Sequence, residues 1–557
     1  MKAFLILVKV LLISRLKGMF DSKRFKSMLA AYIVLAVFGT GMLIALTTGG
    51  AALGFIGADI LAEMLLLYYV ICSMLTVIFG LVPMMSYMYH NNDGEFLASL
   101  PVPENTVFFA KLFTVYLYEF VTGFFLMFFP MLAMGITAGA GAVYYIGLLF
   151  AVILVPALPL LLTSILSVPL MYVTSFFKNK GVLSTIVFIL VFGVIMLVYF
   201  TGIASFQRLG SAGEFNFESV PAVFIEASES LKKIFYPLYA LAAFAGGMYF
   251  VGLDPAVSAV LYLVIALASF FALGAITMLI SSFGYRRGVL GQFENKKSAP
   301  KRAGGYKVSA PRLALMKREW TQIIKNPSVG FQCLFGVVIM PIMLFAYRSL
   351  LSFGADESGE EILFDLSKIM GVMFMCIFCG SLNVAAMTPI SREGANFYQT
   401  KLFPVSYTEQ IRAKQFVNLI IAYASLAAGM AVLITLYSLR PFEAVMLFIF
   451  ETLFIYCFSC FAMRNDIAGP KLNWTAPVEA IKRNAKVTTF QLLSMLVTSG
   501  FGLYFIAGLI AFVFVPFGIW GDLITWLPPV IAAGIMLPVS HKALYKNLEI
   551  KYEEIEF

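Results

Sequence analysis

The sequence predicts an all-α polytopic membrane protein, and three observations lead to this fold class. Of the 557 residues, 61% are hydrophobic and only 12% are charged, whereas soluble domains are about half apolar and about a quarter charged. Apolar runs of roughly 20 or more residues recur along the whole chain, and each can cross about 30 Å of hydrocarbon. Lys and Arg concentrate in alternate loops, as expected when the runs thread a membrane.

The distribution of charge predicts the orientation of the chain. Basic residues gather around 2–26, 178–180, 286–325, 392–414, 464–486 and 542–551. The intervening loops carry little positive charge and more acid, for example Glu214 and Glu218. By the positive-inside rule, the basic loops and both termini are cytoplasmic. The formal charge of +9 therefore reflects topology and attraction to anionic lipid, and it predicts no nucleic-acid partner.

Twelve spans are expected, six in each half of the chain. They fall at about 28–48, 60–88, 107–137, 143–175, 182–204 and 256–283, then at about 329–351, 362–389, 408–437, 441–463, 487–516 and 520–540. An even number of spans in each half gives the two halves the same orientation, which predicts a parallel internal repeat. We predict a first half at 1–285, a basic cytoplasmic linker at 286–310 and a second half at 311–557.

The segment at about 205–253 is predicted to be an outer insertion in the first half. Its apolar part is broken by Pro237 and Gly246. If this part crossed the membrane, the basic run from Arg286 would lie outside, so we expect it to be re-entrant or interfacial.

An interfacial helix is expected before the first span of each half. The chain start resembles a signal peptide only superficially, because Lys9 interrupts its apolar run and no small-residue cleavage site follows. The second helix begins at Pro311 and places Leu313, Met316, Trp320 and Ile323 on one face. Both are predicted to lie along the inner leaflet.

Two loops between predicted spans share a skeleton. The first contains Asp93-Gly94-Glu95-Phe96, Pro101-Val102 and Lys111; the second contains Ser391–Tyr398, Pro404-Val405 and Lys414. A short helix that ends in a proline turn and runs directly into a span can transmit motion without bending. We therefore predict partner-docking elements, and the alternative is an ordinary capped loop near the headgroups. The predicted docking residues are Asp93, Glu95, Phe96, Pro101, Arg392, Glu393, Phe397 and Pro404.

Specific roles are expected within the second loop. Arg392 and Glu393 would pair with charges on the partner, and Phe397 and Phe403 would fill an apolar pocket there. Ser406-x-x-Glu409 is a capping-box pattern, which predicts that the next span begins firmly at this turn.

At these residues the sequence resembles the permease subunits of bacterial ABC exporters of the ABC-2 kind, and in particular the double-length permeases whose two halves are fused. The resemblance rests on Ser391-Arg392-Glu393-Gly394, on Phe403-Pro404-Val405-Ser406 with Lys414, and on Leu472-Asn473-Trp474. It rests also on the plan of elbow helices, docking helices and outer re-entrant helices. The first loop departs from the pattern, since Asp93-Gly94-Glu95 replaces the Arg-Glu-Gly arrangement.

The resemblance implies two six-helix ABC-2-type pseudo-repeats with amphipathic elbow helices and cytoplasmic coupling helices. It implies a multi-pass protein of the bacterial cytoplasmic membrane that exports a substrate the sequence does not identify. ATP would be bound by a separate ABC ATPase in two copies, and this chain would hold no cofactor. The sequence is consistent with that division of labour, because no G-x-x-x-x-G-K-[ST] loop occurs in it.

Two acids inside predicted spans, Glu119 and Glu451, are candidates for an intramembrane pathway. The alternative for each is a neutral carboxyl that is hydrogen-bonded to a neighbour or lies near the outer interface. Cys376-x-x-Cys379 and Cys457-x-x-Cys460 allow a thiolate metal site to be considered, but cysteines at this spacing inside spans are usually packing residues.

Two other functional classes compete with the ABC permease. A secondary transporter driven by an ion gradient predicts paired charges and broken helices at the midplane, and the sequence offers only the unmatched Glu119 and Glu451. A membrane-embedded lipid-modifying enzyme predicts clustered His, Asp or Glu near one interface, and no such cluster is seen in the sequence. We therefore expect no catalytic residue and no enzymatic activity in this chain. The basic loop from Arg464 to Lys486 is expected to lie on the membrane surface or to touch the ATPase.

Overall fold

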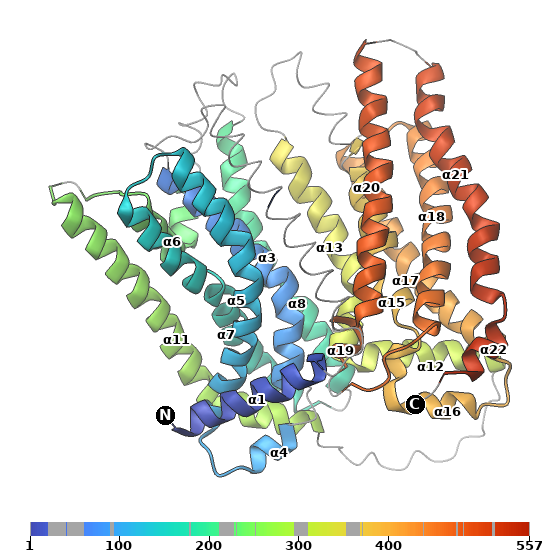
Figure 1. The fold of residues 1–557 in the computed structure, drawn as a ribbon, viewed down its shortest axis with the longest axis horizontal. Coiled ribbons are helices and arrows are strands. Elements are labelled where there is room, and N and C mark those ends of the chain that lie inside the picture. The colour runs from blue at the N-terminus through green and yellow to red at the C-terminus, as the bar shows by residue number, and fades with distance from the viewer. Residues whose placement is uncertain are drawn as a thin grey trace. The chain divides into compact units, whose positions relative to one another are not determined.

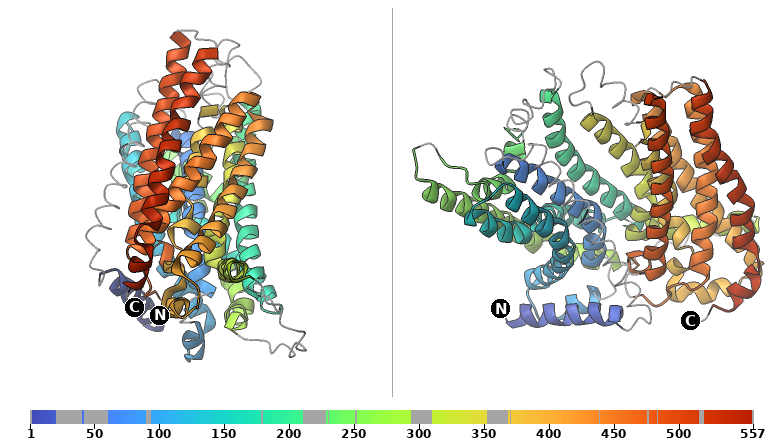
Figure 2. Two further views of the ribbon diagram at one scale, coloured as in Figure 1. Left: turned by 90° about the vertical axis from the view of Figure 1, so that its right-hand side faces the viewer. Right: turned by 45° about the horizontal axis from the view of Figure 1, so that its top comes forward.

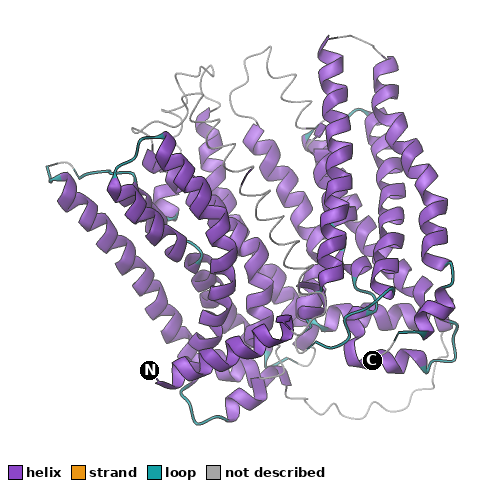
Figure 3. Cartoon of the chain, viewed as in Figure 1, coloured by secondary structure: helices purple, strands orange, loops and turns teal. Residues whose placement is uncertain are grey.

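The protein forms two compact all-helical units. The computed structural model describes residues 2–20, 41, 61–89, 94–177, 180–210, 228–229, 231–250, 252–293, 310–351, 368–369, 371–437, 439–474, 477–482, 484–514 and 519–555. Every element within these ranges is a helix (Figure 3). One unit is Met1–Glu294 with Ser352–Gly354, and the other is Asn295–Leu351 with Ala355–Phe557.

The first unit packs long helices around a short one. Its helices are α1 (Lys2–Phe20), α3 (Leu61–Tyr89), α4 (Gly94–Ser99), α5 (Glu104–Thr137), α6 (Ala142–Leu154), α7 (Ala157–Thr174), α8 (Lys180–Gly210), α10 (Tyr236–Ala245) and α11 (Pro255–Phe293). Helix α10 packs against α3, α6 and α11, and α7 packs against α3, α8 and α11. Helix α1 packs on α5 and lies across the end of its unit (Figure 1).

The structure refines the expectations for this unit. The span expected at 143–175 corresponds to the apolar stretch Ala142–Thr174, within which a turn at Val155-Pro156 separates α6 from α7. Helix α10 has ten residues, too few to cross the hydrocarbon, and the re-entrant placement of this segment on the outer side stays a prediction. Helix α11 continues to Phe293, so the first residues of the predicted linker from Arg286 are helical. The span expected at 28–48 lies outside the described residues apart from residue 41.

The second unit places a helix across one end of a bundle. Its elements are α12 (Pro311–Lys325), α13 (Pro327–Leu351), π-helix η3 (Cys376–Ser381), α15 (Val384–Met387), 3-10 helix η4 (Ser391–Asn396), α16 (Phe397–Lys401), α17 (Tyr407–Leu436), α18 (Pro441–Ile467), α19 (Glu479–Lys482), α20 (Ala485–Phe514), α21 (Ile519–Tyr545) and α22 (Leu548–Glu553). Helix α18 packs against α17, α20 and α21, and α12 packs against α13 and α17. The left view of Figure 2 shows α12 nearly end-on beside the long helices.

Proline marks the start of several helices in both units. Pro255, Pro311, Pro327 and Pro441 are the first residues of α11, α12, α13 and α18. Proline suits this position because its fixed φ is already helical and its missing N–H would have no intrahelical partner there. These starts agree with the expected boundaries at about 256, 311, 329 and 441.

Only part of the apolar face predicted for α12 is buried in the structure. Ile323 is fully buried, and Met316 packs against the same cluster, which includes Val329, Val417 and Ile421. Leu313 and Trp320, by contrast, are 60% and 38% exposed. Glu319 is buried on the face that carries Met316 and Ile323, as its spacings of three and four residues from them require.

Within the described ranges, nine helices are long and apolar enough to cross a membrane. This establishes an α-helical multi-pass protein, and the count of twelve spans stays a prediction. One of the nine, Gly371–Lys401, is discontinuous. Its first helix continues into the π-helix η3 and ends at Leu382. Asn383 then caps the start of α15, where its Oδ1 accepts a hydrogen bond from Ala386 N at 3.3 Å. The break brings the segment from Ser391 to the end of the unit where α12 lies (Figure 1).

Candidate functional site

The two predicted docking loops fold into the same turn. In the first, Val102 N donates to Leu100 O at 2.8 Å around Pro101; in the second, Val405 N donates to Phe403 O at 2.8 Å around Pro404. A short helix precedes each turn, α4 in the first unit and α16 in the second. A long helix follows directly, α5 or α17, so the expected order of short helix, proline turn and long helix is confirmed for both loops.

Four charged side chains meet beneath the second loop and form a buried charge network of Glu319, Arg392, Glu393 and Lys414. Lys414 Nζ on α17 lies 2.6 Å from Glu393 Oε1 and 2.9 Å from Glu319 Oε2. The Arg392 guanidinium donates to the other oxygen of Glu319. All four residues are at most 9% exposed. The network therefore joins the elbow helix α12, the docking loop and α17.

Additional hydrogen bonds satisfy the groups of this network. Arg392 also donates to Ala385 O at 2.8 Å, and Lys414 also donates to Pro389 O at 3.0 Å. The Thr400 hydroxyl of α16 donates to Glu393. Burial raises the pKa of Glu319, but the cations of Lys414 and Arg392 outweigh it, so the pKa of this carboxyl lies below its ordinary value. Glu319 is therefore ionised at neutral pH and pairs with both cations.

A second cluster fixes the start of the loop to the end of α18. Asp466 Oδ2 accepts hydrogen bonds from Ile390 N at 2.7 Å and from Ser391 N at 3.0 Å, and the Ser391 hydroxyl donates to Oδ1. The same hydroxyl oxygen accepts from Lys471 N at 2.9 Å and from Asn484 Nδ2 at 3.2 Å. The loop between α18 and α20 is thus bound to the docking loop.

Two of the motif residues, Trp474 and Gly394, contact each other in the structure. Trp474 Nε1 donates to Ser391 O at 2.9 Å. Gly394 has φ of 54°, which side chains other than glycine rarely adopt, and a Cβ there would lie 2.6 Å from two indole carbons of Trp474. The indole covers the backbone at Gly394, so glycine is required for both conformation and space.

The inward direction of three predicted docking residues corrects the roles expected for them. Arg392 and Glu393 pair within the chain, and Phe397 is fully buried with its ring centroid 5.2 Å from that of Tyr552. They therefore support the loop from below and are unavailable to a partner's surface in this conformation. The outward side chains include Tyr398 at 50% exposed, Leu402 at 76% exposed, and Pro404.

Phe403 is also engaged within the chain. The Arg318 guanidinium of α12 lies 4.6 Å from the Phe403 ring centroid and donates to Thr400 Oγ1 at 3.2 and 3.1 Å. The start of α17 is capped by Ser406 Oγ, which accepts from Glu409 N at 3.4 Å. The Glu409 carboxylate pairs with Arg412 at 2.8 Å, so the capping bond of Ser406 is confirmed as one half of the predicted box.

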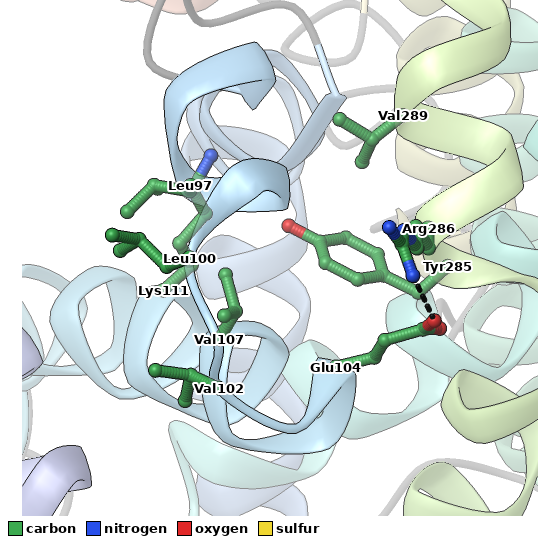
Figure 4. Close-up of a pocket in the computed structure, with 9 residues that line it drawn as sticks. All are labelled: Leu97, Leu100, Val102, Glu104, Val107, Lys111, Tyr285, Arg286 and Val289. Carbon is green, nitrogen blue, oxygen red and sulfur yellow. Dashed lines mark hydrogen bonds and ion pairs between the residues drawn. The ribbon is translucent and has the colours of Figure 1, made fainter.

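The first loop lies over a pocket of about 470 Å³, counting the space open to solvent. Figure 4 shows the Tyr285 ring among apolar side chains of α4, α5 and α11, with the Arg286–Glu104 ion pair at 3.5 Å beside it. The lining residues include Leu97, Leu100, Val102, Val107, Val289 and Lys111. This loop is therefore supported mainly by apolar and aromatic groups.

Of the four docking residues predicted in the first loop, the structure describes the side chains of two. Phe96 is 65% exposed and Pro101 is exposed, as docking residues should be. Asp93 and the side chain of Glu95 lie outside the described residues. Lys111, at the position that corresponds to Lys414, is 1% exposed, and its Nζ donates to Tyr87 O at 3.4 Å.

The two intramembrane acids differ in their surroundings. Glu451 on α18 is fully buried, and its Oε1 accepts a hydrogen bond from Cys376 Sγ at 2.9 Å, at the first residue of η3. Its Oε2 has no hydrogen-bond partner among the described residues. Glu119 on α5 is partly exposed and lies against Gly80 of α3, where a Cβ would come within 2.9 Å of its carboxyl carbon. Glu119 belongs to the first unit and Glu451 to the second.

The cysteine pairs do not converge on a metal site in the described part of the chain. Cys379 Sγ lies 3.8 Å from Met340 Sδ, Cys457 contacts Ala533 O at 3.6 Å, and Cys460 accepts from Gln415 at 3.2 Å. Among the residues that the structure describes, no group of three or more His, Cys, Asp or Glu is arranged to hold a metal ion.

Sequence reasoning missed Glu319, Asp466 and Thr400 as parts of this site. Glu319 is the single acid in the basic helix α12, and an isolated acid on the apolar face of such a helix is a usable signal. Asp466 lies at the end of a span, where a carboxylate is easily read as solvated. Its role depends on Ser391, 75 residues away in sequence.

Comparisons with family models, curated proteins and solved structures gave no match for this chain. The resemblance to ABC-2 permeases therefore rests on the motifs and on the plan described above.

Proposed function

We propose that this protein is the membrane-spanning permease subunit of an ABC exporter, coupled to a separate ATPase through the two docking loops. The observation that carries the proposal is the repeated turn, with Val102 N bonded to Leu100 O and Val405 N bonded to Phe403 O, each between a short helix and a long one. A paired element of this kind suits a partner that binds as two copies. The absence of a phosphate-binding loop from the sequence supports a separate source of ATP hydrolysis.

The buried charge network gives the second loop the stiffness that coupling needs. A force applied at Leu402 passes through α16 to Glu393 and Lys414, and so to α17 and α12. Ion pairs buried on all sides resist separation, because removal of one partner costs about 3–5 kcal/mol. The proposed result is that closure of the ATPase dimer moves α17 with the loop and opens the pathway alternately to the two sides.

The proposed setting is the bacterial cytoplasmic membrane, with both termini and both docking loops cytoplasmic. The exported substrate is not specified by any residue described above. No catalytic residue is assigned to this chain, and ATP would be bound by the partner.

The test is a detergent pull-down of the tagged protein from its native host. We expect an ATPase with a phosphate-binding loop to co-purify with the wild type. Leu402→Asp combined with Phe96→Asp should release it, because both substitutions place charge on exposed apolar side chains. The matched control is Asn396→Ala, an exposed position at the same loop whose side chain makes no cap bond.

A gradient-driven secondary transporter is the second candidate, favoured by one observation. Glu451 is fully buried beside the π-helix of a discontinuous span, and one of its oxygens has no hydrogen-bond partner among the described residues. Buried carboxyls next to broken helices are typical of ion-coupled sites. If no ATPase co-purifies under mild conditions, transport that depends on a proton gradient and on Glu451 would favour this candidate.

A further inference from the structure

We propose that the segment Leu548–Ile555, which contains α22, forms one docking surface together with α16, and that this surface fits a partner whose contact region is an apolar cleft with a basic rim. The inference rests on the proposed function, since the partner is taken to be the ATPase. It extends the docking site to a segment about 150 residues away from the loop.

The first support is a lysine that joins the two elements. Lys401 Nζ, at the end of α16, donates to Glu553 O at 2.9 Å and to Ile555 O at 2.7 Å. These carbonyls lie at the C-terminal end of α22, where the helix dipole and the unpaired carbonyls favour a cation. Lys401 therefore fixes the end of α22 beside α16.

The second support is an aromatic contact below the surface. Tyr552 of α22 is fully buried, with its ring centroid 5.2 Å from Phe397 of α16 and 4.6 Å from Tyr407 of α17. The same cluster contains Leu548 and Ile555. Burial of the Tyr552 ring against both helices favours movement of α16, α17 and α22 as one body.

The third support is a cap supplied from α22. Glu549 Oε1 accepts hydrogen bonds from Thr408 N at 3.1 Å and from Thr408 Oγ1 at 2.7 Å. The carboxylate thus satisfies a free N–H in the first turn of α17 and opposes the positive end of its dipole. Contacts at both ends of α22 and in its middle hold it against the docking loop.

The outward groups of this combined surface indicate the chemistry of its partner. Leu402, directly after α16, is 76% exposed, Tyr398 of α16 is 50% exposed, and Ile550 of α22 is 58% exposed. Glu553 and Glu554 are exposed at the end of α22, and the segment carries three glutamates against one lysine. Exposed apolar anchors with acidic neighbours fit an apolar cleft with Lys or Arg at its rim. An anionic membrane surface would repel the two glutamates, which favours a protein as the occupant.

The experiment measures the affinity of the co-purifying ATPase for the full chain in nanodiscs at 50 and 300 mM salt. The variant is Glu553→Lys with Glu554→Lys, and the control is Glu229→Lys, which reverses an acid that is 61% exposed on the predicted outer segment. We expect the double reversal to weaken binding about tenfold at low salt and less at high salt, because exposed charge pairs are screened. The control should bind as the wild type does.

Thermal unfolding of each variant shows that the fold is kept. A second variant, Ile550→Asp, probes the apolar part of the surface and should also weaken binding. Unchanged affinity in the double reversal and in Ile550→Asp, with a wild type that binds, overturns this inference alone. A wild type that binds no ATPase overturns the proposed function and this inference together. Crosslinking of Leu402→Cys to a second copy of the chain in preference to the ATPase would also overturn it.

Discussion

Lys414 Nζ of α17 lies 2.6 Å from Glu393 Oε1, and both residues are nearly excluded from solvent. Glu393 belongs to the docking loop, and Lys414 belongs to the helix that would move in transport. Thr400 donates to the other oxygen of Glu393, so one carboxylate connects α16 to α17.

Glu319→Gln should destabilise the protein strongly. The change leaves the buried cations of Arg392 and Lys414 without their shared carboxylate, and loss of one partner of a buried ion pair costs about 3–5 kcal/mol. Thermal unfolding in detergent measures the effect. The control, Glu409→Gln, breaks the exposed pair with Arg412, which should cost about 0–1 kcal/mol. Equal effects of the two substitutions would contradict the account.

The stability that Glu319 contributes should depend on pH in a definite direction. Its pKa in the folded protein lies below the ordinary value of 4.5 because of Lys414 and Arg392, despite burial. The contribution is therefore complete above about pH 4.5 and is lost as pH falls through the lowered pKa. Melting temperatures of wild type and Glu319→Gln should differ by a constant amount near neutral pH and converge at acid pH. A gap that widens on acidification would have the wrong sign.

Gly394→Ala should distort the docking loop. A residue with a side chain in this sparsely populated conformation (φ of 54°, ψ of −137°) costs about 1–3 kcal/mol, and the added Cβ would also meet the indole of Trp474. The melting temperature should fall, and it should fall less when Gly394→Ala is made in a Trp474→Ala background. Gly193 of α8 offers a control, because a Cβ there meets nothing within 4 Å and alanine is favoured in helices by about 1 kcal/mol. Equal losses in both backgrounds would show that the indole is not the obstacle.

Asp466→Asn should loosen the loop without unfolding the helices. Asparagine retains one acceptor, yet it cannot accept the three hydrogen bonds from Ile390 and Ser391 with its amide nitrogen. Trp474 depends on Ser391 O for its hydrogen bond, so its indole should become more accessible to a soluble quencher. The measurement needs Trp474 as the sole tryptophan. Helical content by circular dichroism should not change, and unchanged quenching would contradict the role given to Asp466.

Much of the fold follows from the sequence because composition and periodicity act locally. Spans longer than 20 residues, helix starts at prolines and the repeated Pro-Val turn all depend on neighbours along the chain. The span at 143–175 was expected, but the turn at Val155-Pro156 inside it was not, because the run is strongly apolar on both sides of the turn. Hydropathy alone does not distinguish one long helix from two.

The sequence predicts less well which side chains of the site point inward and which are exposed. Arg392 and Glu393 in a basic loop suggest solvated charges, and only the fold brings Glu319 to Arg392 from 73 residues away. Leu402 was not among the predicted docking residues. In this structure the charged residues are inside, and Leu402 is outside.

The most direct test of the central claim is site-specific crosslinking from Leu402→Cys. All six native cysteines are buried, so the new thiol would be the accessible one. A short reagent that is thiol-reactive at one end and photoreactive at the other should join it to the co-purified ATPase, whereas Leu496→Cys, which is 69% exposed on a predicted span, should give no such product. A crosslink from Leu402→Cys alone is the result the account predicts. No crosslink from Leu402→Cys in a complex that retains its ATPase would contradict the assignment of this loop as the docking site.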